Sequence, residues 1–242
     1  MRDRKERMEE VRINKYINLC GIASRREADE LVAAGRVSVN GEPATAGRKV
    51  TDRDTVCVDG KEVKPLEKKR FYAFYKPVGV TTTRKDEHAG ITLESYFPNA
   101  GSLTYAGRLD KDSEGLLIMT DDGALAGRMM HGRAQHEKEY VVTLKKDVTK
   151  DFLEAFSKGV FLKDLNRRTK PCKIKKLGKR SVDIVLTEGL NRQIRRMCKE
   201  LGNEVVTLKR IRVMNILLGD LQPGEYRKLS AEEERGLRQN VR

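Results

Sequence analysis

The sequence predicts an α+β protein in two parts, a small N-terminal module over residues 11–60 and a larger domain over residues 71–242. Three observations support this division. Two short helical patterns are followed by β-hairpin signals within the first sixty residues. A charged, Pro-containing segment over residues 61–70 is typical of a linker. The rest of the chain alternates β runs with short helices, and the charged, aperiodic residues 1–10 are expected to be disordered.

The N-terminal module begins with a helix and contains two hairpins. The helix is predicted by apolar residues at i, i+3, i+4 and i+7, which are Ile13, Tyr16, Ile17 and Cys20. Gly21 is expected to end it. Further along, Asn40-Gly41 and Asp59-Gly60 each follow a short β pattern. Both dipeptides favour tight two-residue turns, so they predict hairpins.

A second helix of this module is predicted by a capping-box pattern, in which Ser24 is followed three residues later by Glu27. Arg25 and Arg26 occupy the first turn, where the helix dipole disfavours positive charge. This local cost suggests a compensating anion, and phosphate is the natural one. Two solvated arginines are the alternative reading of the same pattern.

The larger domain opens with an aromatic strand over residues 71–75, which the turn-forming Lys76-Pro77-Val78-Gly79 ends. Further on, a polar, Gly-bounded loop that contains Asp110 runs directly into the apolar Leu116-Leu117-Ile118-Met119. A carboxylate at the mouth of a buried strand is held by the sheet and can face a cleft, as catalytic groups commonly do. On local pattern alone, the loop also fits a surface turn with solvated charges.

The chain from residue 136 onward predicts further strands and three helices, the first over residues 150–158. Residues 136–144 form a strong β run, in which Tyr140 on pattern alone fits a half-buried core residue. Asn191 is the expected N-cap of a helix that ends at Gly202. Two closing strands are expected over residues 205–209 and 212–218, before a short helix with a capping box.

The composition favours a nucleic-acid partner. Lys and Arg outnumber Asp and Glu by 50 to 36, which gives a formal charge of +14 and is typical of a polyanion binder. No apolar run approaches the roughly 20 residues needed to span a bilayer. The first ten residues contain no signal-peptide core, so we expect a cytoplasmic protein.

Cysteine and histidine usage predicts no metal site and no disulfide framework. The four cysteines form no CxxC pair, and the three histidines show no metal-ligand spacing. These residues are Cys20, Cys57, Cys172, Cys198, His88, His131 and His136. The chain also lacks a Walker A loop and a GxGxxG motif, so we expect no cofactor.

Five segments of the larger domain stand out besides residues 12–41 of the N-terminal module. They are Tyr75-Lys76-Pro77-Val78-Gly79, Gly107-Arg108-Leu109-Asp110, Ser113-Glu114-Gly115-Leu116-Leu117, Lys138-Glu139-Tyr140 and EGLNRQIRRMC over residues 188–198. These segments resemble the family of pseudouridine synthases that modify ribosomal RNA, in the branch that carries an N-terminal S4 RNA-binding domain. The match to the S4 domain covers residues 12–41, and the whole resemblance covers residues 12–227. It implies a catalytic domain with a mixed, mainly antiparallel sheet, flanking helices and a central cleft.

The resemblance also implies roles for individual residues. Asp110 is expected to act on a uridine that has left its stack, with Tyr140 packed under the uracil and Arg195 paired with Asp110. The Tyr-Lys-Pro-x-Gly segment is expected to brace the catalytic loop, and Arg108 to hold the space that the flipped base leaves. The reaction is a redox-neutral isomerisation, so it implies no metal, nucleotide or redox cofactor. Residues expected to contact RNA are Arg12, Lys15, Arg25 and Arg26 in the S4 domain and Arg108, Arg192 and Arg196 in the catalytic domain.

Details such as HEKEY, KPCKIKK and RIRVMN are most similar to the RluF type, which implies a uridine of 23S rRNA near the peptidyl transferase centre. RluF-type members can carry a longer basic C-terminal tail than this sequence shows. The related RluB, RluE and small-subunit RsuA types share the core motifs, and a tRNA substrate is a further alternative. We expect the protein to be a monomer that does not bind membranes.

Two functions of other classes also fit parts of the sequence. A non-catalytic ribosome-assembly protein would share the S4 module and the basic charge, but it would not require Asp110. A metal-dependent nuclease is suggested by the carboxylates Asp110, Asp112, Asp121 and Asp122, and it predicts dependence on Mg²⁺.

Overall fold

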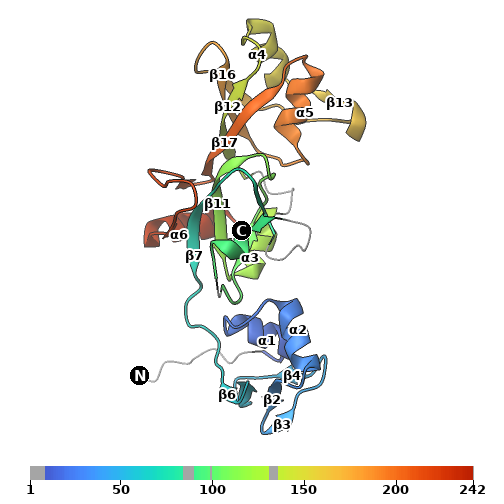
Figure 1. The fold of residues 1–242 in the computed structure, drawn as a ribbon, viewed down its shortest axis with the longest axis vertical. Coiled ribbons are helices and arrows are strands. Elements are labelled where there is room, and N and C mark those ends of the chain that lie inside the picture. Colours follow the sequence, from blue (N-terminus) through green and yellow to red (C-terminus); the bar gives the residue numbers. More distant parts are fainter. Residues whose placement is uncertain (1–8, 84–89, 99, 131–135, 242) are drawn as a thin grey trace. The chain divides into compact units, whose positions relative to one another are not determined.

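The computed structural model describes residues 9–83, 90–98, 100–130 and 136–241. These divide into two compact units (Figure 1). One unit contains the chain up to Arg70 together with Phe97–Thr104, and the other contains Phe71–Tyr96 and Tyr105–Arg242. Residues 1–8 of the segment expected to be disordered lie outside the described residues, whereas Glu10 is placed and its carboxylate pairs with Lys49 at 2.8 Å.

The N-terminal unit combines two helices with short strands, as the hairpin and helix patterns predicted. Its sheet has the strand order β3-β2-β5-β6, and a separate pair joins β1 to β4. The elements are α1 (Ile13–Leu19), α2 (Arg25–Ala33), β1 (Val11–Arg12), β2 (Val37–Val39), β3 (Glu42–Pro43), β4 (Lys49–Val50), β5 (Val56–Val58) and β6 (Lys61–Glu62). Asn40 and Asp59 adopt positive φ angles of 55° and 51° in the two hairpin turns.

Local sequence signals account for the second helix. The Ser24 side chain accepts a hydrogen bond from Glu27 N, and the Glu27 side chain accepts one from Ser24 N, which completes the expected capping box. Ala28 and Val32 are buried on its inner face, against Ile13 and Ile17 of α1 and the sheet. The unit therefore has an apolar core of its own.

Residues 61–70 differ from the linker that we expected. Lys61 and Glu62 form β6, which pairs with β5, and Val63 packs against the core of the N-terminal unit. The backbone N–H of Leu66 donates to Leu19 O at 3.0 Å. Charge and Pro content suggested a linker, but Lys61 and Glu62 form the edge strand of the N-terminal sheet.

The larger unit is built on a nine-stranded sheet whose main strand order is β15-β16-β12-β17-β11-β7-β19. Among its described pairings, β11 with β17 is parallel and the others are antiparallel. The sheet is therefore mixed and mainly antiparallel, as predicted. Its strands are β7 (Phe71–Lys76), β10 (Thr104–Ala106), β11 (Glu114–Thr120), β12 (Lys138–Leu144), β15 (Lys173–Lys176), β16 (Ser181–Leu186), β17 (Val205–Val213), β18 (Ile216–Leu217) and β19 (Tyr226–Lys228).

Helices and two short strand pairs, β8 with β9 and β13 with β14, complete this unit. They are β8 (Val80–Thr81), β9 (Ile91–Thr92), η1 (Leu93–Ser95), α3 (Gly123–Met130), α4 (Lys150–Ser157), β13 (Phe161–Leu162), η2 (Lys163–Leu165), β14 (Arg167–Arg168), α5 (Gln193–Glu200) and α6 (Ala231–Asn240). One apolar cluster joins β7 and β11 to α3 and α6, and a second joins β12 and β16 to α4 and α5. None of the helices described in either unit has the length and apolar character to cross a membrane.

Two predicted boundaries were wrong. The closing strands that we expected over residues 205–209 and 212–218 are one continuous strand, β17, followed by the short β18. Helix α5 begins after Arg192, which has a positive φ of 51°, and not after Asn191. The Gln193 side chain accepts a hydrogen bond from Leu190 N at 2.9 Å, so it organises the turn that a conventional N-cap would otherwise organise.

Candidate active site

The Asp110 loop connects β10 to β11 and is held tightly where it enters the strand. Ser113 N donates to Asp110 O at 3.0 Å, which forms a turn. Gly115 pairs with Arg210 of β17 and has a φ of +108°. A Cβ atom at this position would lie 2.3 Å from Arg210 O, so only glycine fits. The end of the loop, where β11 begins, therefore packs directly against β17, the parallel neighbour of β11.

A second segment braces the loop, as the resemblance implied. Gly79 N donates to Lys111 O at 2.7 Å. The buried Thr82 hydroxyl donates to Leu109 O at 2.6 Å and accepts from Leu109 N at 3.3 Å. Both backbone groups of the residue before Asp110 are therefore fixed by one side chain, which orients the Asp110 backbone.

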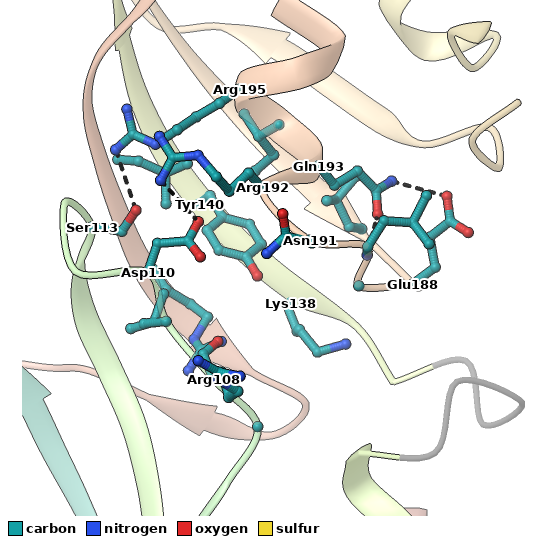
Figure 2. A pocket seen from close by; sticks show the side chains of 18 of the residues that line it. Arg108, Asp110, Ser113, Lys138, Tyr140, Glu188, Asn191, Arg192, Gln193 and Arg195 are labelled. Atoms are coloured by element: carbon teal, nitrogen blue, oxygen red, sulfur yellow. Dashed lines mark hydrogen bonds and ion pairs between the residues drawn. The ribbon is translucent and has the colours of Figure 1, made fainter. Parts of the chain in front are cut away.

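Asp110 lies at a cavity of about 400 Å³ in the larger unit (Figure 2). The cavity is lined by the Asp110 loop, β12, the segment between β16 and α5, the start of α5, and β17. Its charged and aromatic lining residues are Arg108, Asp110, Lys138, Tyr140, Glu188, Arg192, Arg195 and Arg210. The sequence-predicted residues Asp110, Tyr140, Arg195, Arg108 and Arg192 are therefore brought together at one cavity.

Tyr140 is a buried residue of β12 whose ring forms part of the cavity wall. It pairs in register with Arg210 of β17, the residue that also pairs with Gly115. Three adjacent strands consequently carry Tyr140, Arg210 and the end of the Asp110 loop. An aromatic ring at this depth offers a flat apolar surface against which a planar base can pack.

The cation beside Asp110 is Arg192, not the expected Arg195. Arg192 Nη1 lies 3.9 Å from Asp110 Oδ2, and the same guanidinium binds both carboxylate oxygens of Asp112, at 3.1 and 2.7 Å. Because Arg192 adopts the left-handed conformation just before α5, its side chain reaches the loop from the rim of the cavity. Asp110 keeps 34% of its side chain exposed, so the carboxylate is accessible from the cavity.

Arg195 supports the loop instead. Its Nη2 donates to Asp112 O at 2.7 Å and to Ser113 Oγ at 3.2 Å, and its Nε lies 3.3 Å from Asp112 Oδ2. Among the interactions of the described residues, none joins Arg195 to the Asp110 carboxylate. Arg195 lies one turn beyond Arg192 on α5, so its side chain reaches the far half of the loop.

These contacts set the charge state of the loop. Burial raises the pKa of Asp112, but hydrogen bonds from Arg192 and the positive charge of Arg195 outweigh burial and leave this pKa below its usual range.

The pKa of Lys138, on β12, is also shifted. It falls to about 8, chiefly because of burial and further because of the positive charge of Arg210, with Glu188 opposing both effects.

Arg210 ties both ends of the Asp110 loop to β17. It is 2% exposed, and its Nε donates to Leu116 O at 2.7 Å while its Nη1 donates to Arg108 O at 3.2 Å. Glu188 plays a similar part on the opposite wall, where its buried carboxylate accepts from Lys170 N at 2.8 Å and from Gln193 Nε2 at 2.9 Å. Each residue fixes a cavity segment through polar contacts.

The remaining predicted residues lie elsewhere. Arg196 forms an ion pair with Asp164 and donates to Asn191 O at 2.9 Å, so its guanidinium joins α5 to the 3-10 turn η2 and it is not among the cavity-lining residues. Four side chains of the N-terminal unit are exposed on or next to α1 and α2, and their RNA contacts remain predictions. They are Arg12, Lys15, Arg25 and Arg26.

The four carboxylates that suggested a nuclease do not meet at the cavity. Asp110 and Asp112 precede β11, whereas Asp121 and Asp122 follow it, so a seven-residue strand of about 20 Å separates the two pairs. Asp122 accepts from Leu125 N at 3.0 Å and pairs with Arg238 at 3.1 Å. No metal-binding group of three or more His, Cys, Asp or Glu side chains is present in the described parts of the chain.

Four residues of the site were not singled out from the sequence: Thr82, Lys138, Glu188 and Arg210. Lys138, Glu188 and Arg210 stood inside quoted segments, Arg210 as the first residue of RIRVMN. Lys138 occupies position i−2 to Tyr140, on the same face of the strand, and that spacing was a usable signal. The roles of Thr82 and Arg210 had no local signal, because their partners lie 27 to 102 residues away in the chain.

Two family models match the chain, and they agree with its two units. The model described as RNA pseudouridylate synthase matches residues 70–200. The model of the S4 domain matches residues 11–56. The larger match contains every cavity segment except β17, and the smaller one contains both helices of the N-terminal unit.

Similar proteins and a solved structure extend the match to pseudouridine synthases over almost the whole chain. The dual-specificity RNA pseudouridine synthase RluF of Escherichia coli (strain K12) is 42% identical over 92% of this chain and 77% of its own. The ribosomal large subunit pseudouridine synthase B of Bacillus subtilis (strain 168) is 35% identical over 94% of this chain and 95% of its own. A crystal structure of a pseudouridylate synthase superposes with a TM-score of 0.69 at 30% identity and covers 94% of this chain and 99% of its own.

Proposed function

Because the chain belongs to the RNA pseudouridylate synthase family and carries an N-terminal S4 domain, we propose that it converts one uridine of 23S rRNA, near the peptidyl transferase centre, into pseudouridine. The resemblance to RluF-type sequences and the large-subunit activity named for the Bacillus subtilis relative support this target. A uridine of 16S rRNA or of tRNA is the alternative substrate within the same reaction.

The observation that carries the catalytic assignment is the position of Asp110. Its carboxylate lies at a cavity of about 400 Å³, on a loop braced by Thr82, Arg195 and Arg210. A uridine inside a duplex or stack cannot reach such a site, so the nucleotide must flip out. The aromatic wall at Tyr140 then supports the uracil ring while Asp110 faces the ribose and the base.

The reaction exchanges one bond for another. The N1–C1′ bond breaks, a C5–C1′ bond forms, the proton on C5 is lost and N1 gains a proton, so the composition of the nucleotide does not change. Asp110 supplies the carboxylate that acts as nucleophile or proton acceptor. Arg192, at 3.9 Å, places a positive charge beside it.

The exposed basic residues of the S4 helices and of the cavity rim provide the RNA-binding surface in this proposal. Arg12, Lys15, Arg25 and Arg26 contact the backbone through the N-terminal unit, and Arg108 and Arg192 contact the target nucleotide region at the cavity. In this proposal the enzyme acts as a monomer. We also propose that the enzyme acts in the cytoplasm.

The test is pseudouridine mapping of 23S rRNA, 16S rRNA and tRNA after incubation with wild type, Asp110→Asn or Asp220→Asn in buffer with EDTA. We expect one new site in 23S rRNA with wild type and Asp220→Asn, and none with Asp110→Asn. Asp220 is an exposed matched control outside the cavity lining. Modification of tRNA or 16S rRNA alone would refute the 23S assignment, and an active Asp110→Asn variant would refute the role of Asp110.

A further inference from the structure

Lys138 lies in the cavity wall without a strong partner. It is on β12 two residues before Tyr140, so both side chains project from the same face of the strand. In Figure 2 the Lys138 side chain extends below the Tyr140 ring, on the side of the cavity that faces Glu188 rather than Asp110. The wall opposite the catalytic carboxylate therefore carries a cation.

The hydrogen bonds of Lys138 leave most of its donor capacity unused. An ammonium group has three N–H donors, and Lys138 Nζ makes one long hydrogen bond, to His136 O at 3.3 Å. Within the described residues, no carboxylate lies within ion-pair distance of this nitrogen. A partly buried ammonium in this state is costly, so the arrangement indicates a position that a ligand completes.

Lys76 provides an internal comparison. It is also a buried lysine of the same sheet, and burial lowers its pKa to about 8 as well. Its Nζ, however, donates two hydrogen bonds of 2.8 Å, to Pro77 O and Val80 O, and Lys76 is not among the cavity-lining residues. Lys76 is satisfied by its own turn, whereas Lys138 faces the cavity with unused donors.

Arg210, on the strand next to β12, adds a second positive charge to the cavity. Two of its guanidinium nitrogens hold the Asp110 loop, and the third, Nη2, is buried without a hydrogen-bond partner among the described residues. Arg210 is the register partner of Tyr140 and lines the cavity. Lys138 and Arg210 lie on the adjacent strands β12 and β17, and we call the cavity surface that they form its cationic side.

The charge that this cationic side complements arises on the base. When the N1–C1′ bond breaks, its electron pair leaves with the uracil and is shared by the ring carbonyl oxygens. If the carboxylate instead adds to C6 of the ring, the electron pair moves to the same conjugated carbonyl system. Either route makes the carbonyl oxygens more negative, so a donor aimed at them stabilises the transition state.

Resting on the proposed function, we propose that Lys138 is a further catalytic residue, whose ammonium donates a hydrogen bond to a carbonyl oxygen of the flipped uracil and stabilises the negative charge that develops there. Lys138 transfers no proton in this step and remains an ammonium throughout. Arg210 holds the loop and adds to the positive field behind it. The binding site for the Watson–Crick edge of the base is therefore the β12 side of the cavity.

The first test compares Lys138→Met with wild type and with Lys179→Met in single-turnover pseudouridine formation and in RNA affinity. Lys179 loses the same charge at an exposed position outside the cavity lining. We expect the Lys138→Met rate to fall about 10²-fold, with RNA affinity changed less than about threefold, because most binding energy comes from backbone contacts. Lys179→Met should retain the wild-type rate.

The second test uses Lys138→Arg and pH. The charged groups that face Lys138 are Arg210 on β17 and Glu188 after β16, and the titratable group beside it is His136, whose pKa is lowered by burial and by Lys138. Under conditions that report kcat/KM, the wild-type rate should fall above a pH of about 8, by about tenfold at pH 9, as the Lys138 ammonium deprotonates. The guanidinium of Lys138→Arg stays charged, so the remaining activity of this variant should not show that fall.

A wild-type rate in Lys138→Met, an equal loss of rate and RNA affinity, or the same alkaline fall in Lys138→Arg would each overturn the proposal. If Lys138→Met does not fold, the pH comparison with Lys138→Arg decides. The two proposals fail differently. If wild type and Lys138→Met are both fully active, only the role of Lys138 is refuted. If wild type modifies no RNA, the proposed function and this inference are refuted together.

Discussion

Replacing Thr82 by valine removes one oxygen atom that fixes the backbone before Asp110. Thr82 is 2% exposed, and its hydroxyl is both donor to Leu109 O at 2.6 Å and acceptor from Leu109 N at 3.3 Å. Valine has nearly the same shape, so the packing around the position is kept while both hydrogen bonds are lost. The change therefore isolates the polar bracing of the loop.

The expected cost follows from the two backbone groups that are left buried. Each unpaired group costs about 1–3 kcal/mol, and the extra methyl group of valine returns about 0.8 kcal/mol. We therefore expect the free energy of unfolding of the larger unit to fall by about 1–5 kcal/mol. With a urea m-value of about 2 kcal/mol/M, the midpoint should fall by about 0.5–2.5 M.

The assay is urea unfolding followed by circular dichroism, together with single-turnover pseudouridine formation for the folded protein in the absence of urea. Thr82→Ser keeps the hydroxyl and serves as the matched control. We expect Thr82→Val to react at least about tenfold more slowly than Thr82→Ser, because a displaced Leu109 peptide displaces Asp110. Equal stability and equal rates for the two variants would refute the bracing role of Thr82.

Two further predictions concern charge. The pKa of Asp112 lies below its usual range, so the stability that the Asp112 carboxylate contributes is present above its unfolded pKa and is lost as the pH falls through the folded value. The thermal midpoint of wild type should therefore exceed that of Asp112→Asn at about pH 6 and approach it near pH 3. A difference that does not change with pH would contradict this. In the S4 domain, Arg25→Ala with Arg26→Ala should reduce the slope of log K against log salt for RNA binding by about 0.7–0.9 per arginine, whereas an unchanged slope would show that neither contacts phosphate.

Local sequence signals predicted those parts of the fold whose causes lie within a few residues. The capping box of α2 needed only Ser24 and Glu27, and the hairpin turns needed only Asn40 and Asp59 in a left-handed conformation. The burial and cavity position of Tyr140 followed from its motif. These elements depend on propensity and spacing, which a single sequence displays directly.

The contacts that complete the site join residues far apart in the chain, and the sequence alone could not order them. Asp110 has Arg192 beside it and Arg195 beyond reach because Arg192 adopts a positive φ ahead of α5, a backbone state unusual for arginine. Arg210 reaches the loop through the register of β17 with β11, and Thr82, which lies just after β8, reaches it through a side-chain contact across 27 residues. Register among nine strands depends on the assembled fold, so these partners became visible only in the structure.

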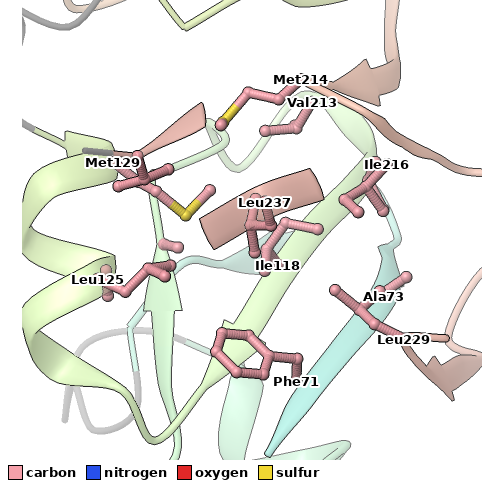
Figure 3. Packing of buried hydrophobic residues seen from close by; sticks show 14 of the residues in the cluster. Phe71, Ala73, Ile118, Leu125, Met129, Val213, Met214, Ile216, Leu229 and Leu237 are labelled. Atoms are coloured by element: carbon pink, nitrogen blue, oxygen red, sulfur yellow. The ribbon is translucent and has the colours of Figure 1, made fainter. Parts of the chain in front are cut away.

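The position of the closing strand in the sheet also affects how the protein is made. Arg210 contacts Leu116 and Arg108 across 94 and 102 residues, and Leu237 of α6 completes the apolar cluster around Phe71 (Figure 3). At a synthesis rate of about 5–20 residues per second, the Asp110 loop waits about 5–20 s for β17. Helices α1 and α2 and strands β2 to β6 lie within the first 62 residues, so a growing chain carries these RNA-binding elements before it has a catalytic cavity.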